Sequence, residues 1–317
     1  IYPIDFDTPD IEGLCTELKA VLEFWIDRGI EIFRVDNPHT KALPFWEWVI
    51  AEIHATHPGV IFLAEAFTRP QMMQQLAKLG FTQSYTYFTW RNTKAELTEY
   101  LTELAHTDMA EYYRPNFWPN TPDILHGYLQ SGAPAAFKTR LALAATMTPN
   151  YGVYSGYELL EHVPVRPGSE EYLDSEKYAY RPRDYDGPHS IAPFMARLNE
   201  IRRAHPHHLR NLGNIWFHHI DNPALLAFSK VPRDRRRPND PPPSDALLVV
   251  VNLDPHHAQE GWLWLDLWQV GLETHPGHYR AHDLLTGLTW HWQGANNWVR
   301  LDPYADHPLH ILHLRRS

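Results

Sequence analysis

Most of the chain alternates short apolar runs with longer amphipathic stretches, and this alternation limits the possible folds more than any other feature. Segments 30–35 and 60–64 are β-branched, aromatic and nearly continuous, as buried strands are, and 43–54 between them has helical spacing. Such strand–helix–strand units wind right-handed around a parallel sheet. A closed barrel of this type has eight strands, and five strand–helix pairs are present here. The sequence therefore predicts a partial (β/α)8 TIM barrel, about its strands 4–8.

Glycine, proline and capping residues bound the other elements of this part. A first helix ends at Gly29, and a later one begins at Pro70 and ends at Gly80. Thr93 and Glu96 have the spacing of a capping box, which predicts the start of a helix. We also expect strands over 81–88, 112–118 and 151–154, and helices over 135–147 and 191–204.

The pattern changes after His205-Pro206, where short strands separated by turns replace the helices. We therefore expect two domains: residues 1–208 form the C-terminal part of the barrel, and 209–317 form an antiparallel β-sandwich. Segment 232–244, rich in arginine and proline, is expected to be a solvated hairpin loop. The expected strands of the second domain are 215–217, 225–228, 246–253, 261–267, 279–281, 289–292 and 310–314.

Composition excludes several classes of protein. A net charge of −10 argues against nucleic acid and anionic membranes as partners. The longest apolar stretch, 141–147, is too short to span a bilayer. One cysteine, Cys15, excludes internal disulfides and fits a reducing, cytoplasmic location. Neither a metal-ligand spacing nor a glycine-rich phosphate loop is present, so we expect no metal and no organic cofactor.

Three carboxylates share one position relative to the predicted elements. Asp36, Glu65 and Asp123 each follow a short strand and precede a helix, so a barrel would bring them to one mouth. Arg34 faces the same side as Asp36 and would hold it ionised. Cleavage of a glycosidic bond needs a nucleophilic carboxylate and a carboxylic acid, and a third can bind the distorted sugar. Each of these carboxylates alone could form a strand-end ion pair or cap a helix. It is much less expected that all three would take this position by coincidence.

The motifs around these residues resemble those of the α-amylase superfamily. Phe33-Arg34-Val35-Asp36 resembles the fourth-strand motif, whose aspartate is the nucleophile. Phe62-Leu63-Ala64-Glu65 resembles the fifth-strand motif, which carries the general acid/base. Asn120-Thr121-Pro122-Asp123 is similar to the seventh-strand motif, which ends in the aspartate that stabilises the transition state. The spacings of 29 and 58 residues suit one and two intervening strand–helix units.

One departure narrows the resemblance. Most amylases have Asn-His-Asp on the seventh strand, whereas Thr121-Pro122 stands in the neighbourhood of the histidine here. Together with 36–41 and 64–70, this resembles the α-1,4-glucan:maltose-1-phosphate maltosyltransferases (GlgE-type), a family of bacterial glucan-building enzymes. The resemblance implies that Asn37 and the pair Lys177 and Tyr178 bind the donor, with Arg34 as a further substrate-binding residue.

The resemblance also implies a reaction. Asp36 would attack α-maltose 1-phosphate, phosphate would leave with help from Glu65, and the β-maltosyl group on Asp36 would pass to an α-1,4-glucan acceptor. Retention by this route predicts that the Asp36 and Glu65 carboxyl groups lie roughly 5–5.5 Å apart. Family members of this kind are homodimers, so we expect a homodimer here.

Two alternatives use the same residues differently. The three carboxylates would serve an α-glucan hydrolase or another transglycosylase equally well. The chain begins at Ile1 without an initiator methionine, and the first barrel strands are not among those we recognise. A non-catalytic fragment that binds glucan through its aromatic residues is therefore the second alternative. An open half-barrel would expose sheet edges and apolar surface.

Overall fold

The computed structural model describes residues 4–175, 180–232, 241, 243, 245–273, 278–304 and 307–316, and it divides into two compact units. The first comprises Ile1–Tyr87 and Asp108–Asn116, and the second comprises Phe88–Thr107 and Phe117–Ser317. The domain boundary expected after residue 208 stays a prediction. None of the helices in the described part is both long and apolar enough to cross a membrane.

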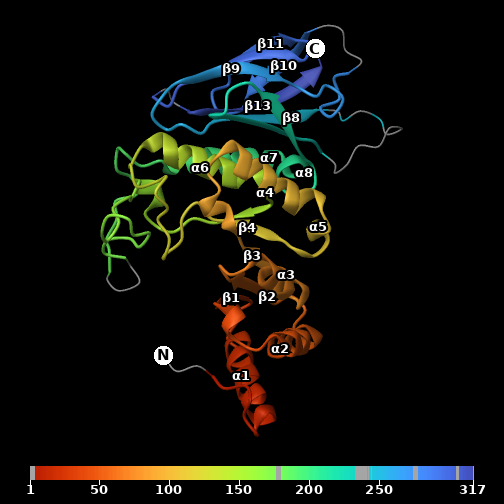
Figure 1. Cartoon of the computed structure of the whole chain (residues 1–317), viewed down its shortest axis with the longest axis vertical. Coiled ribbons are helices and arrows are strands. Elements are labelled where there is room, and N and C mark those ends of the chain that lie inside the picture. Colours follow the sequence, from red (N-terminus) through yellow and green to blue (C-terminus); the bar gives the residue numbers. More distant parts are fainter. Residues whose placement is uncertain are drawn as a thin grey trace. The chain divides into compact units, whose positions relative to one another are not determined.

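The first unit is built on parallel strands, drawn in red through orange to yellow in Figure 1. β1 (Ile32–Asp36), β2 (Ile61–Glu65), β3 (Gln83–Tyr85) and β4 (Pro115–Phe117) follow one another in sheet order, as predicted. Phe117 itself belongs to the second unit. The helical elements of the first unit are α1 (Ile11–Ile26), η1 (Pro38–Thr40), α2 (Leu43–Thr56), α3 (Pro70–Lys78) and α5 (Met109–Tyr112).

The core of the first unit lies between α2 and β2. Val49 and Ile53 of α2 and Phe62 of β2 are fully buried there. Gly80, at φ +111°, ends the α3 segment in a conformation that favours glycine, and a Cβ there would meet Ile50 at 2.9 Å. The positive φ and the close approach of Ile50 both favour glycine at position 80, in agreement with its predicted role in ending the helix.

The expectation of a buried first strand was wrong. Ile32 of β1 is 58% exposed, and α1 contributes no buried residue. In the described part of the chain β1 pairs with β2 on one side, so its other edge meets no strand. The apolar run has the composition of a buried strand. In this structure, however, β1 has a neighbouring strand, β2, along one edge only.

The expected strand over 81–88 is shorter than predicted. β3 ends at Tyr85, and the 3-10 helix η2 (Tyr87–Trp90) follows. Arg140 explains part of the change, because its guanidinium donates to the carbonyl oxygens of Phe88 (2.5 Å) and Arg91 (2.7 Å). These carbonyls bind a buried cation in place of a neighbouring strand.

The second unit places helices on one side of a large antiparallel sheet (Figure 1). α6 is buried on nearly every side, with only Pro134 and Lys138 less covered, so its sequence is apolar without a polar face. Thr139 of α6 donates to the carbonyl oxygen of Asn252 on the sheet (3.1 Å). The helical elements are α4 (Lys94–His106), α6 (Pro134–Met147), η3 (Tyr157–Leu159), α7 (Ala192–Ala204) and α8 (Pro206–Leu209), and a short strand is β5 (Asn150–Tyr151).

The antiparallel β domain was predicted, and its strands follow one continuous order, β11-β10-β13-β8-β7-β6-β9-β12. One strand, β12, was missed. Asn297 takes an inward position on it and donates to the Tyr279 hydroxyl (3.0 Å), so the inward side is not uniformly apolar in sequence. The strands are β6 (Ile215–Ile220), β7 (Leu225–Lys230), β8 (Ala246–Asn252), β9 (Gln259–Trp264), β10 (His278–Asp283), β11 (Thr289–Gln293), β12 (Asn296–Leu301) and β13 (Leu309–Arg316).

The predicted capping box of α4 is confirmed and gives a stability prediction. The Glu96 N–H donates to Thr93 Oγ1 (3.3 Å), and the Thr93 N–H donates to the Glu96 carboxylate (3.0 Å). Thr93→Ala should lower the free energy of unfolding by about 1 kcal/mol, and Thr93→Ser should retain it. The measurement is the urea midpoint of each variant. Thr102→Ala, at an exposed site on the same helix, is the control, and an equal loss there would contradict the cap assignment.

Candidate active site

The two N-terminal carboxylates end neighbouring parallel strands. Asp36 is the last residue of β1 and Glu65 the last of β2, and the register pairs them directly. Asn37 then turns the chain away at φ 45°, a left-handed conformation that asparagine tolerates better than most residues. Its N–H donates to the carbonyl oxygen of Glu65 (3.0 Å) and lies 3.4 Å from Glu65 Oε2. The turn thus fixes the end of one strand against the carboxylate of the next.

Arg34 reaches across the strands. Its Nη2 lies 3.3 Å from Glu65 Oε1, while the sequence had placed the arginine beside Asp36. Period-two alternation puts Arg34 on the same face as Asp36, and parallel pairing puts Glu65 within reach of both. The Arg34 side chain is 41% exposed, so water screens part of this attraction.

Glu65 is the buried member of this group. Burial raises the pKa of its carboxyl to about 6, against the opposing effects of the Arg34 guanidinium and the Asn37 N–H. Asp36 raises the same pKa further, through its charge and through a hydrogen bond between the two side chains. A carboxyl group whose pKa is raised toward neutrality can both give and take a proton and is suited to general acid/base catalysis, whereas its exposed neighbour is accessible to a substrate.

Sequence reasoning missed one residue of this cluster. Tyr85 ends β3, the next strand of the sheet, and is buried. Burial raises the pKa of its hydroxyl, while the Arg34 guanidinium beside it acts in the opposite direction. Tyr113 holds the strand end by donating to the carbonyl oxygen of Tyr85 (3.1 Å). The strand was expected to run on to residue 88, so the sequence did not mark Tyr85 as a strand-end residue.

Asp123 belongs to the second unit, where its motif is firmly held. Asn120 is fully buried and donates to the Tyr172 hydroxyl (2.8 Å), while the Tyr154 N–H donates to Asn120 Oδ1 (2.9 Å). Asp123 is exposed, and its N–H donates to Thr121 Oγ1 (3.2 Å). The motif thus joins the segment after β5 to a later loop.

The structure therefore brings together part of the predicted site. Arg34, Asp36, Asn37 and Glu65 form one cluster with the added Tyr85. Asp123 lies in the other compact unit. Lys177 and Tyr178 lie outside the described residues. Within the described ranges, no group of three or more His, Cys, Asp or Glu side chains could hold a metal ion.

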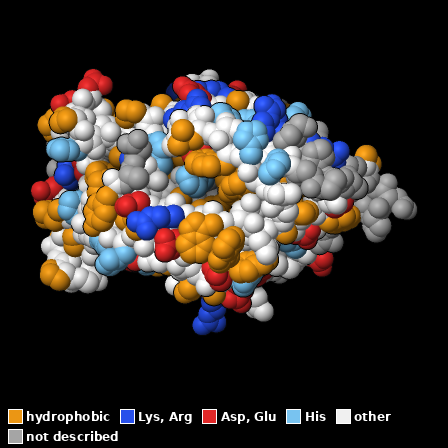
Figure 2. Space-filling model, turned by 90° about the horizontal axis from the view of Figure 1, so that it is seen from above, with side chains coloured by type: hydrophobic (Ala, Val, Ile, Leu, Met, Phe, Trp, Pro, Cys, Tyr) orange, Lys and Arg blue, Asp and Glu red, His pale blue; other side chains and the backbone are white. Residues whose placement is uncertain are grey.

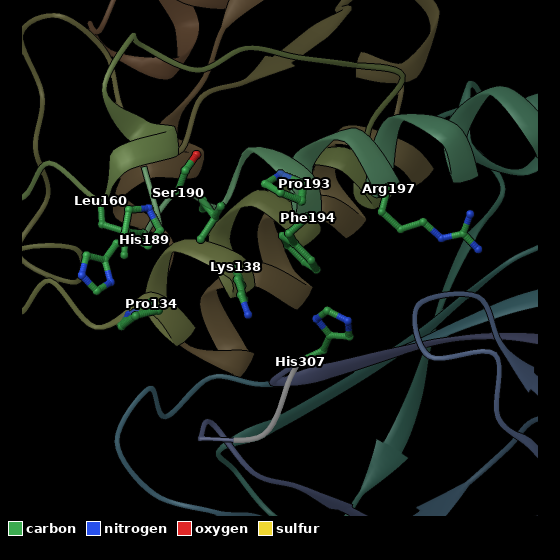
Figure 3. Close-up of a pocket in the computed structure, with 11 residues that line it drawn as sticks. Pro134, Lys138, Leu160, His189, Ser190, Pro193, Phe194, Arg197 and His307 are labelled. Carbon is green, nitrogen blue, oxygen red and sulfur yellow. The ribbon is translucent and has the colours of Figure 1, made fainter. Parts of the chain in front are cut away.

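The second unit also contains a cavity of about 550 Å³, shown in Figure 3. Its walls come from α6, α7, the segment before α7 and His307, and no predicted site residue lines it. Lys138 points toward His307, with Phe194 beside them (Figure 3). Arg197 extends to another side, where it donates to the carbonyl oxygen of Leu284 (2.7 Å) and pairs with Glu200 (3.0 Å). The residues that line this cavity are apolar, basic or neutral, and none of them carries a carboxylate.

Solved structures show the same fold at low sequence identity. An α-amylase from Anoxybacillus matches with a TM-score of 0.70 and 15% identity, covering 99% of this chain and 65% of that one. CldA, a cyclomaltodextrin glucanotransferase, matches with a TM-score of 0.69 and 14% identity, covering 99% and 62%. These matches confirm the predicted fold class, a partial barrel with a β domain, and at this identity they show the fold alone.

Sequence relatives are much closer. Residues 217–314 match the family described as "GLGE, C-terminal". The chain is 57% identical to α-1,4-glucan:maltose-1-phosphate maltosyltransferase 2 of Streptomyces coelicolor, covering 100% of this chain and 45% of that protein. It is 52% identical to the maltosyltransferase of Mycolicibacterium smegmatis (99% and 44%) and 48% identical to that of Methylacidiphilum infernorum (100% and 46%).

The chain thus spans somewhat less than half the length of these curated relatives, and the likeness covers essentially all of it. The part it matches includes the C-terminal region of the family. The carboxylate motifs and the sequence identities of 48–57% indicate the same family, and the fold agrees with that family. The chain belongs to the family of the α-1,4-glucan:maltose-1-phosphate maltosyltransferases.

Proposed function

We propose that this chain carries the catalytic carboxylates of a maltosyl transfer from α-maltose 1-phosphate to the non-reducing end of an α-1,4-glucan. The observation that carries the proposal is the pairing of Asp36 with Glu65 at adjacent strand ends, with a raised pKa on Glu65. The names of the relatives supply the substrates. Together these observations support a reaction in which one carboxylate attacks and the other transfers a proton.

The proposed reaction is a double displacement with retention. In the first half, an Asp36 oxygen bonds to the anomeric carbon as the bond to the phosphate oxygen breaks, and Glu65 gives its proton to that oxygen. In the second half, Glu65 takes the proton of the acceptor 4-hydroxyl, whose oxygen bonds to the anomeric carbon and frees Asp36. The bound sugar must hold the two carboxyl groups roughly 5–5.5 Å apart, which breaks the hydrogen bond between them.

The other assignments rest on the family resemblance. Asp123 would stabilise the transition state, and Asn37, Lys177 and Tyr178 would contact the donor. A homodimeric, cytoplasmic protein without a metal or organic cofactor completes the proposal. Arg34 has support from geometry, because its ion pair with Glu65 limits how far burial raises the pKa of that carboxyl.

The raised pKa of Glu65 predicts a pH dependence. Because Glu65 must start protonated, kcat/KM should fall as the pH rises through about 6. Arg34→Ala removes the charge that lowers this pKa, so the alkaline limb of the profile should move to higher pH. Arg28→Ala, at an exposed arginine of the first unit, is the matched control and should leave the limb in place. An unmoved limb in Arg34→Ala would show that another group titrates.

A direct assay tests the reaction itself. With α-maltose 1-phosphate and maltohexaose, phosphate should be released while the glucan grows by two glucose units at a time. Asp36→Asn and Glu65→Gln should each lower kcat by at least about 10²-fold. Asp27→Asn, an exposed aspartate in the first unit, should have no effect. Glucan shortening without phosphate release would identify a hydrolase, and glucan binding without turnover would identify a non-catalytic chain.

A further inference from the structure

Three tryptophans stand exposed on one face of two neighbouring strands of the β domain. Trp262 and Trp264 of β9 and Trp298 of β12 are 45%, 36% and 47% exposed. The register places Trp298 opposite Trp262, and their ring centroids lie 5.4 Å apart at an interplanar angle of 70°. We call these three residues the tryptophan patch. Large aromatic side chains grouped in water mark a binding surface more often than chance exposure does.

Charged and polar side chains flank the rings. Glu260 and Arg300 face the same side as the patch and form an ion pair (3.2 Å). His219, also exposed, has its ring 5.0 Å from that of Trp264. The tryptophan rings therefore have an ion pair at one end of the patch and a histidine ring beside Trp264. A surface of this kind offers flat apolar faces and hydrogen-bond partners within a few ångströms of one another.

A small hollow adjoins the patch between the two edge strands, β11 and β12. It has a volume of about 140 Å³. Trp298 of the tryptophan patch and the neighbouring Arg300 are among the residues that line it. His310 stands on its wall with its Nδ1 hydrogen-bonded to the fully buried carboxylate of Asp283 (3.0 Å). That contact fixes the ring and leaves Nε2 as the second hydrogen-bonding atom. The residues that line the hollow are Trp290, Trp292, Trp298, Val299, Arg300, His310 and Leu312.

The area of the patch argues against another protein as the occupant. A whole aromatic side chain contributes at most about 250 Å², so the exposed parts of the three tryptophans amount to roughly 300 Å². A stable protein interface needs roughly 800 Å² on each partner. On the face of the molecule drawn in Figure 2, histidines and charged residues lie among the hydrophobic side chains.

We propose that the tryptophan patch and its adjoining hollow bind an α-1,4-glucan chain. Indole faces pack against the C–H faces of glucose rings, and Arg300, Glu260 and His310 bind hydroxyl groups. An α-1,4 linkage turns each glucose unit against the next, so rings inclined at 70° suit successive units better than a flat partner. The inference deepens the proposed function by naming a second contact for the same polymer, and the choice of glucan rests on that proposal.

Such a contact would raise the local concentration of acceptor ends. A long glucan held on the β domain samples a smaller volume than one free in solution, so its non-reducing ends meet the enzyme more often. The effect requires a polymer long enough to engage both places at once. Short acceptors should therefore depend little on the patch.

Binding can be measured apart from catalysis. The protein should be retarded in native gels that contain glycogen, and the Trp262→Ala and Trp298→Ala variants should each bind glycogen about tenfold more weakly. Trp298→Phe, which keeps a ring, should retain most of the binding. Trp25→Ala is the matched control, because Trp25 is 48% exposed on α1 of the first unit. Circular dichroism of each variant checks that it is folded.

The outcomes separate this inference from the proposed function. Unchanged retardation in folded Trp262→Ala and Trp298→Ala would overturn the glucan assignment, whatever the transferase assay gives. Glucan-free association that these variants abolish, seen by sedimentation, would assign the patch to a second copy of the chain. Loss of glycogen binding with unchanged kcat/KM on maltohexaose would support the inference. Glycogen binding in a protein that transfers no maltosyl would leave the patch standing and reject the proposed reaction alone.

Discussion

The candidate site depends on the register of one pair of parallel strands. Because β1 and β2 pair residue for residue from Ile32 and Ile61 to Asp36 and Glu65, both carboxylates leave the sheet at the same level. A slip of one residue would turn one of them to the opposite face. The neighbouring residues reinforce the register, since Asn37 bonds back to the carbonyl oxygen of Glu65. The proposed division of labour between nucleophile and acid follows from this placement and from the different exposure of the two groups.

Much of this arrangement was predictable from the sequence. The β1 and β2 ends, the α4 cap and the antiparallel domain all follow from local patterns that act within a few residues. Tyr85 could not be placed in advance, because its role depends on a third strand bringing its hydroxyl to Arg34. The partner of Arg34 was misjudged for the same reason, since an ion pair across strands has no signal along one strand. β12 escaped because a buried asparagine, satisfied by Tyr279, interrupts its apolar positions.

The two units contribute different kinds of chemistry to the proposed function. The first carries acidic and basic groups at the end of a small sheet, where burial and charge set a pKa. The second carries an antiparallel framework, in which the buried Asp283 holds His310, and, outside that sheet, the buried Asn120 joins two loops. Proton transfer needs the first kind of environment, and recognition of a long polymer is served by the second. The family resemblance joins them, since the relatives match both units at once.

The exposed edge of β1 links strand pairing to the nucleophile. In the described residues β1 has one strand neighbour, and α1 buries none of its own side chains, so the segment that carries Asp36 can open at a small free energy. Any strand that paired with this edge would favour the ordered state of Asp36. By thermodynamic reciprocity, a ligand that required ordered Asp36 would strengthen that pairing by the same factor. Binding of a sugar at Asp36 and pairing of a further strand with β1 would then each shift the same equilibrium between the open and the ordered state of this segment.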